Sequence, residues 1–167
     1  MPHDCCHSCR SISGEKRISP GPVIHEGKYW VIEHAYPTAL KGWLVIVLKR
    51  HAEALHELTA DEFAELGELQ HRLARLLHAE TGCLKEYSVC FAEMAGFYHI
   101  HFHIIPRGVD WPDDLKGGKS FALLKVSEAD AVPPEEIRAY CERLARNFLS
   151  GCPKRRAQRL RSATDCA

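Results

Sequence analysis

Three histidines alternate with apolar residues in the stretch HIHFHIIPR, residues 99–107. Residues two apart on a β-strand share a face, so His99, His101 and His103 would line one side of such a strand. Ile100 and Phe102 would point to the other side and pack against the core. An unpaired polar group is costly to bury, so the histidine side must face something polar or reactive.

Three explanations compete for this row of imidazoles. The first is structural, with the rings hydrogen-bonded on a wet sheet face. The second is a metal site, but strand rise separates the outer pair by roughly 13 Å. Zinc–nitrogen bonds of about 2.0–2.1 Å let adjacent members share an ion but not easily all three. The third is catalytic, because imidazole attacks, donates or accepts a proton near neutral pH. Three rings in register favour catalysis over the structural explanation.

Composition limits the class of protein. The chain has 167 residues, a formal net charge of zero and 26% charged residues, which fits one domain with a substantial core. This charge balance argues against general nucleic-acid or membrane binding, and no run of about 18 apolar residues is present. The start, MPHDCCHSCR, lacks the apolar core of a secretory signal, which favours a reducing cytoplasm. The eight cysteines are then thiols or metal ligands.

The pattern of the elements predicts an α+β fold with an antiparallel sheet. A hairpin turning at Glu26-Gly27 and a buried strand over residues 42–51 come first. A long helix follows, with a Thr59–Glu62 capping box, a stop at Gly82 and apolar residues at helical spacing: Phe63, Leu66, Leu69, Leu73, Leu76 and Leu77. Strands at residues 87–93 and 99–105 complete the layer.

Beyond Arg107 the chain predicts a loop, a short strand over residues 121–126 and a second helix. Pro134 suits the first turn of that helix and Gly151 its end. Its buried stripe would be Ile137, Tyr140, Leu144 and Phe148. We therefore expect one domain over residues 1–150 and a basic tail over 151–167. That tail is expected to be a solvated end, the alternative being a phosphate- or RNA-contacting arm.

The motif His-φ-His-φ-His-φ-φ in HIHFHII resembles the signature of the histidine triad (HIT) family of nucleotidyl hydrolases and transferases. The following Pro106-Arg107 is similar to members that cleave dinucleoside polyphosphates. The stretch GWLVIVLKRHAEALHELTADEFAELGEL resembles the family's strand, Lys-Arg-His corner and helix, and CHSC resembles its N-terminal zinc hairpin. The resemblance spans roughly Cys6 to Arg107.

The resemblance implies a HIT-like fold that dimerises through its long helices and sheets. It implies that His101 is a nucleophile that attacks an α-phosphorus, expels the leaving group and forms a nucleotidyl-histidine. Water then releases a nucleoside monophosphate, so one difficult displacement becomes two easier ones. His103 would contact the phosphate and assist the leaving group, and His99 would take the outer, supporting position.

The resemblance also implies a structural zinc ion in the N-terminal segment, a hairpin at about residues 5–10. Its ligands would be Cys6, Cys9, His51 and His99, with Cys5 as an alternative to Cys6. A tetrahedral site of two cysteines and two histidines has no open position and is therefore structural. Such a site would pin the N-terminal segment to the end of the catalytic strand.

The chain departs from the family pattern around the substrate. Many members carry Gly-Gln-Ser/Thr before the triad, where this chain has Ala95 and Gly96; the backbone near Gly96 would then hold phosphate. Trp43 stands where many members have a histidine. Ala35 or His34 stands at the ribose-binding Asp or Asn, depending on the alignment. The predicted substrate-binding residues are therefore Gly96, His34 and Trp43.

Two functions follow. The first is a nucleotidyl hydrolase acting on a dinucleoside polyphosphate or a nucleoside phosphoramidate; the alternative is a zinc-stabilised nucleotide-binding module with little or no turnover. The base, the length of the phosphate chain and the leaving group stay open. A symmetric homodimer is expected, because one long helix covers only part of a five-stranded sheet and twofold dimers dominate soluble oligomers.

Overall fold

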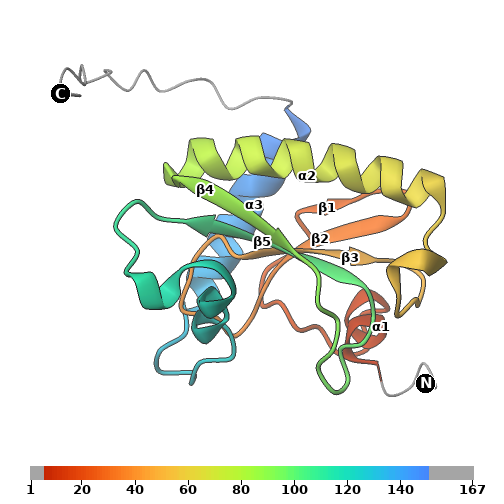
Figure 1. The fold of residues 1–167 in the computed structure, drawn as a ribbon, viewed down its shortest axis with the longest axis horizontal. Helices are drawn as coiled ribbons and strands as arrows, with labels where there is room; N and C mark the ends of the chain where they lie inside the picture. The colour runs from red at the N-terminus through yellow and green to blue at the C-terminus, as the bar shows by residue number, and fades with distance from the viewer. Residues whose placement is uncertain (1–5, 151–167) are drawn as a thin grey trace.

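The computed structural model describes residues 6–150, which form an antiparallel sheet with the two long helices on one face and the short helices at the other (Figure 1). The strand order is β1-β2-β3-β5-β4. The strands are β1 (His25–Glu26), β2 (Trp30–His34), β3 (Leu44–Leu48), β4 (Lys85–Val89) and β5 (His101–Arg107). The predicted α+β architecture is therefore confirmed, with β5 and its histidines next to the centre of the sheet.

The long helix α2 (Ala60–Thr81) begins and ends where the sequence predicts. Thr59 and Glu62 form the reciprocal capping box, and Gly82 ends the helix in the left-handed conformation that glycine adopts without strain. The leucines of the predicted stripe are buried, but Phe63 is 44% exposed. The stripe was therefore wrong at Phe63, which lies in the first turn at the outer side of the helix.

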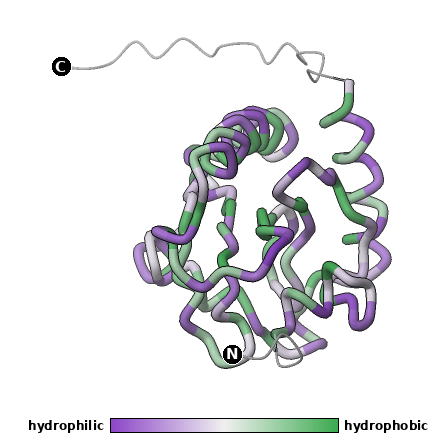
Figure 2. The backbone as a smooth tube through the Cα atoms, turned by 90° about the vertical axis from the view of Figure 1, so that its right-hand side faces the viewer, coloured by the Kyte–Doolittle hydropathy of each residue, from purple (hydrophilic) through white to green (hydrophobic). Residues whose placement is uncertain are grey.

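Helix α3 (Pro134–Leu149) covers the same face of the sheet as α2. Pro134 occupies its first turn, and its predicted stripe is buried together with Cys141. The even-numbered residues of the central strands, such as Ile32 and Ile46, pack against both helices in the main core. Figure 2 shows this amphipathic layering: the central strands are mainly hydrophobic, and the helices alternate hydrophobic and hydrophilic positions.

The opposite face of the sheet carries a second, smaller core. Trp43, Ala35 and Ile105 form its centre. It is covered by the segment after β5, which contains the short 3-10 helices η3 (Asp113–Leu115) and η4 (Gly117–Leu123). The predicted strand over 121–126 was therefore wrong. Phe121 belongs to η4 and packs into this core, and only Leu124 forms a single bridge, with Thr38.

The strand that carries the histidines begins two residues later than predicted. Leu48 and Ala52 bind the backbone of Ile100 outside the regular ladder, through Leu48 N–H to Ile100 O and Ile100 N–H to Ala52 O. The regular pairing then runs from His101 opposite Val47 to Ile104 opposite Leu44. His99 consequently precedes the strand, and its surroundings differ from those of His101 and His103.

None of the helices within residues 6–150 combines the length and apolar composition that a membrane crossing needs. The predicted basic tail, Gly151 and Cys5 lie outside the described residues.

Candidate functional site

Four side chains at the start of β5 form a compact set of possible metal ligands. The donor atoms of Cys6, Cys9, His51 and His99 all lie within 4.8 Å of one another. Cys9 Sγ lies 3.4 Å from His51 Nδ1 and 3.3 Å from His99 Nδ1, and Cys6 Sγ lies 3.5 Å from His99 Nδ1. A tetrahedral ion with zinc-like bond lengths separates sulfur and nitrogen donors by about 3.5 Å. The donor set and its spacing therefore fit zinc.

A short helix presents the two cysteines. Cys6 caps α1 (His7–Ile12), and its Sγ accepts a hydrogen bond from the backbone N–H of Cys9 at 3.4 Å. The predicted hairpin is thus a cap and a first helical turn. Residues three apart lie on the same side of a helix, which brings both sulfurs toward His99. Of the two cysteines proposed for the first ligand position, Cys6 lies there.

The second ring nitrogens of both histidines have polar partners that fix the rings. His99 Nε2–H donates to the carbonyl of Leu48 at 2.6 Å, and His51 Nε2 lies 3.2 Å from a carboxylate oxygen of Glu53. Such outer partners orient metal-binding histidines. Burial and the neighbouring Cys6 raise the pKa of the Cys9 thiol to about 12. A bound cation is what would stabilise the thiolate there.

A second group of possible ligands lies at the far end of α2. His78, Cys83 and Glu86 offer three donor atoms within 4.8 Å of one another. The Cys83 thiol already donates to Glu86 at 3.1 Å, and the His78 side chain is largely exposed. This group supplies one ligand fewer than the first, and we assign it no role.

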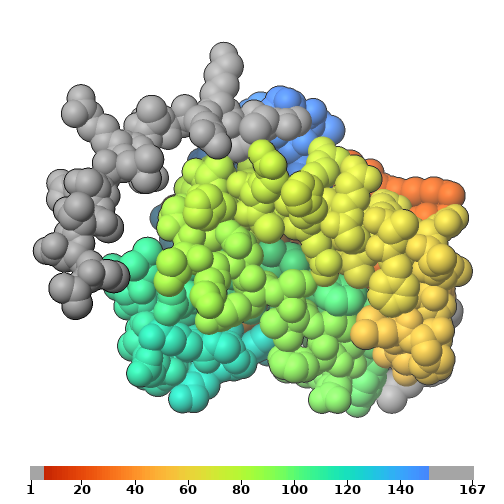
Figure 3. Space-filling model, turned by 45° about the horizontal axis from the view of Figure 1, so that its top comes forward, coloured from red at the N-terminus to blue at the C-terminus, as the bar shows by residue number. Residues whose placement is uncertain are grey.

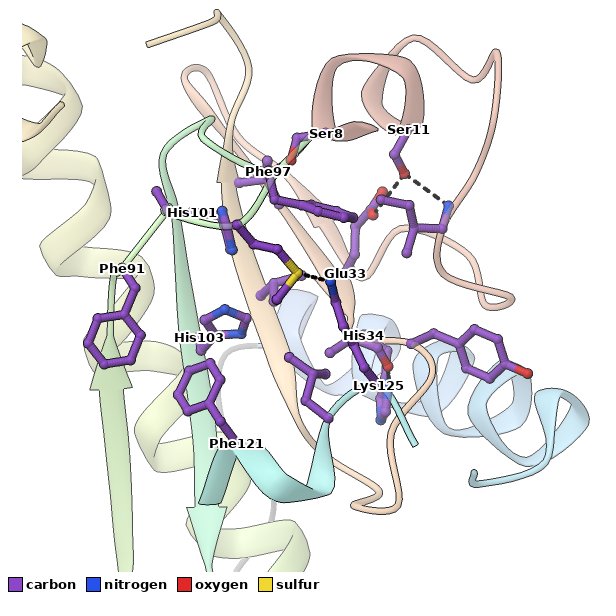
Figure 4. A pocket seen from close by; sticks show the side chains of 18 of the residues that line it. Ser8, Ser11, Glu33, His34, Phe91, Phe97, His101, His103, Phe121 and Lys125 are labelled. Atoms are coloured by element: carbon purple, nitrogen blue, oxygen red, sulfur yellow. Dashed lines mark hydrogen bonds between the residues drawn. The ribbon is translucent and has the colours of Figure 1, made fainter. Parts of the chain in front are cut away.

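A pocket of about 550 Å³ opens beside the other two histidines, on the face of the sheet opposite α2 (Figure 4). His101 and His103 project into it from β5, next to Val45 and Val47 of β3. The remaining wall is mainly apolar and comes from α1 and three loops: Ile12, Ile18, Phe91, Met94, Phe97, Phe121 and Leu124. The apolar lining suits a ligand with an apolar group held beside the imidazoles.

The hydrogen bonds of His101 identify which nitrogen carries its proton. Its Nδ1 lies 2.7 Å from the carbonyl oxygen of His99, which can only accept, so Nδ1 holds the proton. Nε2 is then a lone-pair nitrogen. Burial lowers the pKa of His101 and so favours the neutral ring, although this hydrogen bond acts in the opposite direction. His101 therefore has the protonation that a nucleophile requires.

His103 has the opposite arrangement. The indole N–H of Trp43, which can only donate, points at Nδ1 of His103 at 3.0 Å. The neutral ring therefore carries its proton on Nε2. Burial, assisted by the neighbouring His101, lowers the pKa of His103 to about 3. The two rings lie with their centroids 4.8 Å apart, one as a lone-pair donor and the other as a hydrogen-bond donor.

Trp43 contacts His103 and is completely buried, so the structure places it beside the triad and outside the pocket lining. Gly96 also lies outside the lining. Its carbonyl accepts the N–H of His7 at 2.9 Å, and an added Cβ would lie 2.4 Å from the His7 ring. Phosphate binding by the Gly96 backbone stays a prediction, while the observed contact seats α1.

His34 lines the pocket, but both of its ring nitrogens are occupied. Nδ1 donates to the carbonyl of Ala35 at 2.6 Å, and Nε2 accepts the N–H of Gly42 at 2.9 Å. Burial lowers the pKa of His34 to about 4, despite the bond to Ala35. The observed contacts hold the turn between β2 and β3, and ribose binding by His34 stays a prediction.

Sequence reasoning missed Lys125. This residue lines the pocket with its ammonium 4.9 Å from the centre of the Phe97 ring and in contact with Met94 Sδ. Lys125 and Ala92, another lining residue, are the two non-glycine residues between 6 and 150 with positive φ, 58° and 52°. Strain of this kind concentrates at functional sites. No motif marked either residue, because a single lysine or alanine carries no periodic signal.

Sequence reasoning also missed the ion pair that Arg17 forms with Glu33, a residue of the pocket lining. The Ser11 hydroxyl donates to the same carboxylate at 3.4 Å. Glu33 is buried, and its pairing with Arg17 offsets the charge that it would otherwise direct at an anionic ligand.

Comparison with known proteins supports these features. The family model described as "Scavenger mRNA decapping enzyme C-term binding" matches residues 6–112, well over half of the chain. Adenosine 5'-monophosphoramidase hnt1 of Schizosaccharomyces pombe is 27% identical over 116 residues, which cover 65% of this chain and 74% of that protein.

Solved structures share the fold. A hypothetical histidine triad nucleotide-binding protein from Sulfolobus tokodaii has a TM-score of 0.62 at 20% identity, over 86% of this chain and 93% of that one. A zinc-bound histidine triad family protein from Mycobacterium smegmatis has a TM-score of 0.54 at 20% identity, over 83% and 94%. With the matched family model and the arrangement of HIHFHII on β5, these findings show that the chain belongs to the histidine triad family.

Proposed function

We propose that the protein is a nucleotidyl hydrolase that cleaves at the α-phosphate of a dinucleoside polyphosphate or a nucleoside phosphoramidate. The observation that carries this proposal is the pair of complementary tautomers in one pocket. His101 has a lone pair on Nε2, and His103 has an N–H on Nε2. A binding module would not need a neutral, oriented nucleophile beside a donor.

The first step would be attack of His101 Nε2 on the α-phosphorus. A P–N bond to the enzyme forms, and the bond from phosphorus to the leaving group breaks. The Nδ1–H of His101, held on the His99 carbonyl, stabilises the positive charge that develops on the ring. His103 Nε2–H would donate to a phosphate or leaving-group oxygen.

The second step would be attack of water on the nucleotidyl-His101 intermediate. The P–N bond breaks, its electron pair returns to Nε2, and a nucleoside monophosphate leaves. Lys125 is the cationic residue of the pocket wall, and we propose that it offsets phosphate charge through both steps. The apolar side chains around Phe97 would hold the nucleoside. The relative from Schizosaccharomyces pombe, named as an adenosine monophosphoramidase, supports a nucleotide derivative as the substrate.

We propose that zinc binds Cys6, Cys9, His51 and His99 in a structural role. All four positions of a tetrahedral ion would be filled by protein, so the ion would cross-link α1, the end of β3 and the start of β5. The zinc-bound relative from Mycobacterium smegmatis supports the assignment. A cytoplasmic location is proposed with it, because a reducing compartment keeps such thiols available.

We propose a homodimer as the functional unit. Among the described residues, Phe63 at the outer side of α2 and Leu84 beside β4 are 44% and 54% exposed. Figure 3 shows α2 and β4 side by side on one face, where a second copy could cover both. Light scattering at micromolar concentration should give about twice the 18.9 kDa of one chain. A mass of one chain, unchanged by nucleotide, would rule the dimer out.

The function is tested by incubating the protein with diadenosine tetraphosphate and with an adenosine phosphoramidate, followed by chromatography. Double displacement predicts release of AMP with net retention of configuration at phosphorus. Rapid quenching in alkali should trap a nucleotidyl group on the peptide that contains His101. Tight nucleotide binding without AMP release would instead establish the non-hydrolytic alternative, a nucleotide-binding module.

A further inference from the structure

We infer that the indole N–H of Trp43 fixes the tautomer of His103, so that His103 donates a hydrogen bond through Nε2 but does not transfer a proton to the leaving group. This restricts the enzyme to leaving groups that depart as anions. The favoured substrates are then phosphoanhydrides, such as dinucleoside polyphosphates, over phosphoramidates. This inference rests on the proposed function for its substrate class, while its statement about His103 stands on geometry alone.

The contact between the two side chains is unambiguous in direction. Trp43 has no exposed surface, and its indole nitrogen is a donor without a lone pair to accept. It lies 3.0 Å from Nδ1 of His103, with the two rings edge to face at 86°. Phe121 packs edge to face on both rings, at 87° to Trp43 and 83° to His103. The indole therefore has no room to turn its N–H away.

A second proton on His103 would be strongly opposed. Protonation of Nδ1 would set two N–H groups against each other inside a buried cluster, with no acceptor for either. The ionisable group that faces His103 directly is His101, across 4.8 Å between ring centroids, and a charge there would repel a second one. The charged side chains of the pocket lining are Glu33, Glu93 and Lys125, and Glu33 is paired with Arg17.

The two substrate classes make different demands on this site. When an anhydride P–O bond breaks, the electron pair leaves on a phosphate oxygen, and the resulting anion is stable with a hydrogen bond from His103 Nε2. When a phosphoramidate P–N bond breaks, the pair stays on nitrogen, which requires a proton to leave as an amine. His103 could supply only its Nε2 proton, which would leave an unstable imidazolate. The single ring proton of His101 is held by the His99 carbonyl.

The test replaces Trp43 with His or Phe in the full chain. The Trp43→His variant supplies a second imidazole that can exchange protons with Nδ1 of His103, and Trp43→Phe removes only the N–H. General acid catalysis contributes about 10²–10⁴-fold, so Trp43→His should raise phosphoramidate turnover relative to anhydride turnover by about 100-fold. Trp111→Phe is the matched control. Trp111 belongs to the same small core but lies outside the pocket lining, and its variant should keep the wild-type ratio.

A spectroscopic measurement separates this inference from the proposed function. Nitrogen NMR of ¹⁵N-labelled protein reports the tautomer and charge of each imidazole. Wild-type His103 should show protonated Nε2 and bare Nδ1, and should stay neutral as the pH is lowered from 7 to 5. In Trp43→Phe its Nδ1 signal should begin to titrate in that range.

The outcomes are distinct. A wild-type His103 that is protonated on Nδ1 would overturn the inference, whatever the enzyme hydrolyses. Equal use of both substrates by the wild-type protein, with no change in the Trp43→His variant, would overturn its substrate class. No turnover of either substrate, with the predicted NMR signals, would refute the proposed function and leave the role of Trp43 supported.

Discussion

His99 and His101 are two residues apart, yet the structure gives them opposite surroundings. At the metal end, His99 has Nδ1 among thiols and Nε2 on the carbonyl of Leu48. At the pocket end, His101 has Nδ1 on a carbonyl and Nε2 toward a cavity. A histidine with both nitrogens directed at fixed partners holds structure together, and one with a nitrogen directed at a cavity is available for chemistry. Hydrogen-bond partners distinguish the two histidines better than position in the motif does.

The largest expected effect comes from the pocket end. His101→Ala removes the proposed nucleophile, and turnover should fall on the order of 10⁴-fold. The midpoint of thermal unfolding should change little, because the side chain faces a cavity. Steady-state kinetics and calorimetry on the same preparation measure both. Near-normal hydrolysis by His101→Ala would refute the mechanism, and His101 would then have no chemical role to set against the structural role of His99.

At the metal end, a substitution should lower stability and zinc content strongly. Cys9→Ser removes the sulfur that lies against both histidines, so zinc content should fall from about one per chain toward none. The free energy of unfolding should fall by several kcal/mol, on the order expected when a structural metal is lost. Cys90→Ser, at a half-buried cysteine outside the cluster, should keep the zinc. Metal analysis that finds no zinc in wild-type protein prepared without chelator would contradict the assignment.

Acid should weaken the pocket end in a defined window. The pKa of His103 is lowered from 6.5 to about 3, so the unfolded chain takes up the proton first. The neutral ring makes its full contribution to the free energy of unfolding above pH 6.5. This contribution is lost as the pH falls toward 3, by about 1.4 kcal/mol per pH unit. Urea unfolding from pH 6.5 to 4.5 should give a shallower acid loss for His103→Gln than for the wild type. The proposed metal ligands and His34 are the same in both proteins, so parallel curves would contradict the lowered pKa.

The smallest effect concerns backbone strain, which also differs between the two ends. At the pocket, Ala92 adopts a φ of 52°, whereas beside the metal ligands Gly96 takes a φ of 79°. Ala92→Gly should stabilise the fold by about 0.5–1 kcal/mol through relief of the left-handed conformation. Gly96→Ala should destabilise it by more, because its Cβ would meet His7. Chemical denaturation compares the pair, and stabilisation by Gly96→Ala would contradict the seating of α1.

The sequence was sufficient for the framework and for the identity of the triad. The capping residues and leucine spacing of α2 are local signals, and the alternation of HIHFHII fixes which residues share a face. It could not show that β5 begins at His101, because that boundary depends on backbone contacts of Ile100 with Leu48 and Ala52. The three histidines that were predicted to share one face of a strand therefore divide into His99, before the strand and beside the cysteines, and His101 and His103 at the pocket.

The rest of the site depends on contacts between distant segments. Lys125 reaches the pocket from a segment that the sequence predicted as a strand, and η4 places it there through tertiary packing of Phe121. The tautomer of His103 depends on an indole sixty positions earlier in the chain. Neither residue type predicts such a role, since isolated lysines and tryptophans are ordinary surface and core residues.

Helix α1 contributes both to the cysteine–histidine cluster before β5 and to the pocket beside His101 and His103. Cys6 and Cys9 belong to its cap and first turn, while Ser8, Ser11 and Ile12 form part of the pocket wall. One element of six residues thus joins the ligands of an ion to the boundary of a substrate cavity. Binding at two sites that share an element is thermodynamically reciprocal. If the proposed zinc ion orders α1 and so tightens nucleotide binding, nucleotide must tighten zinc binding by the same factor.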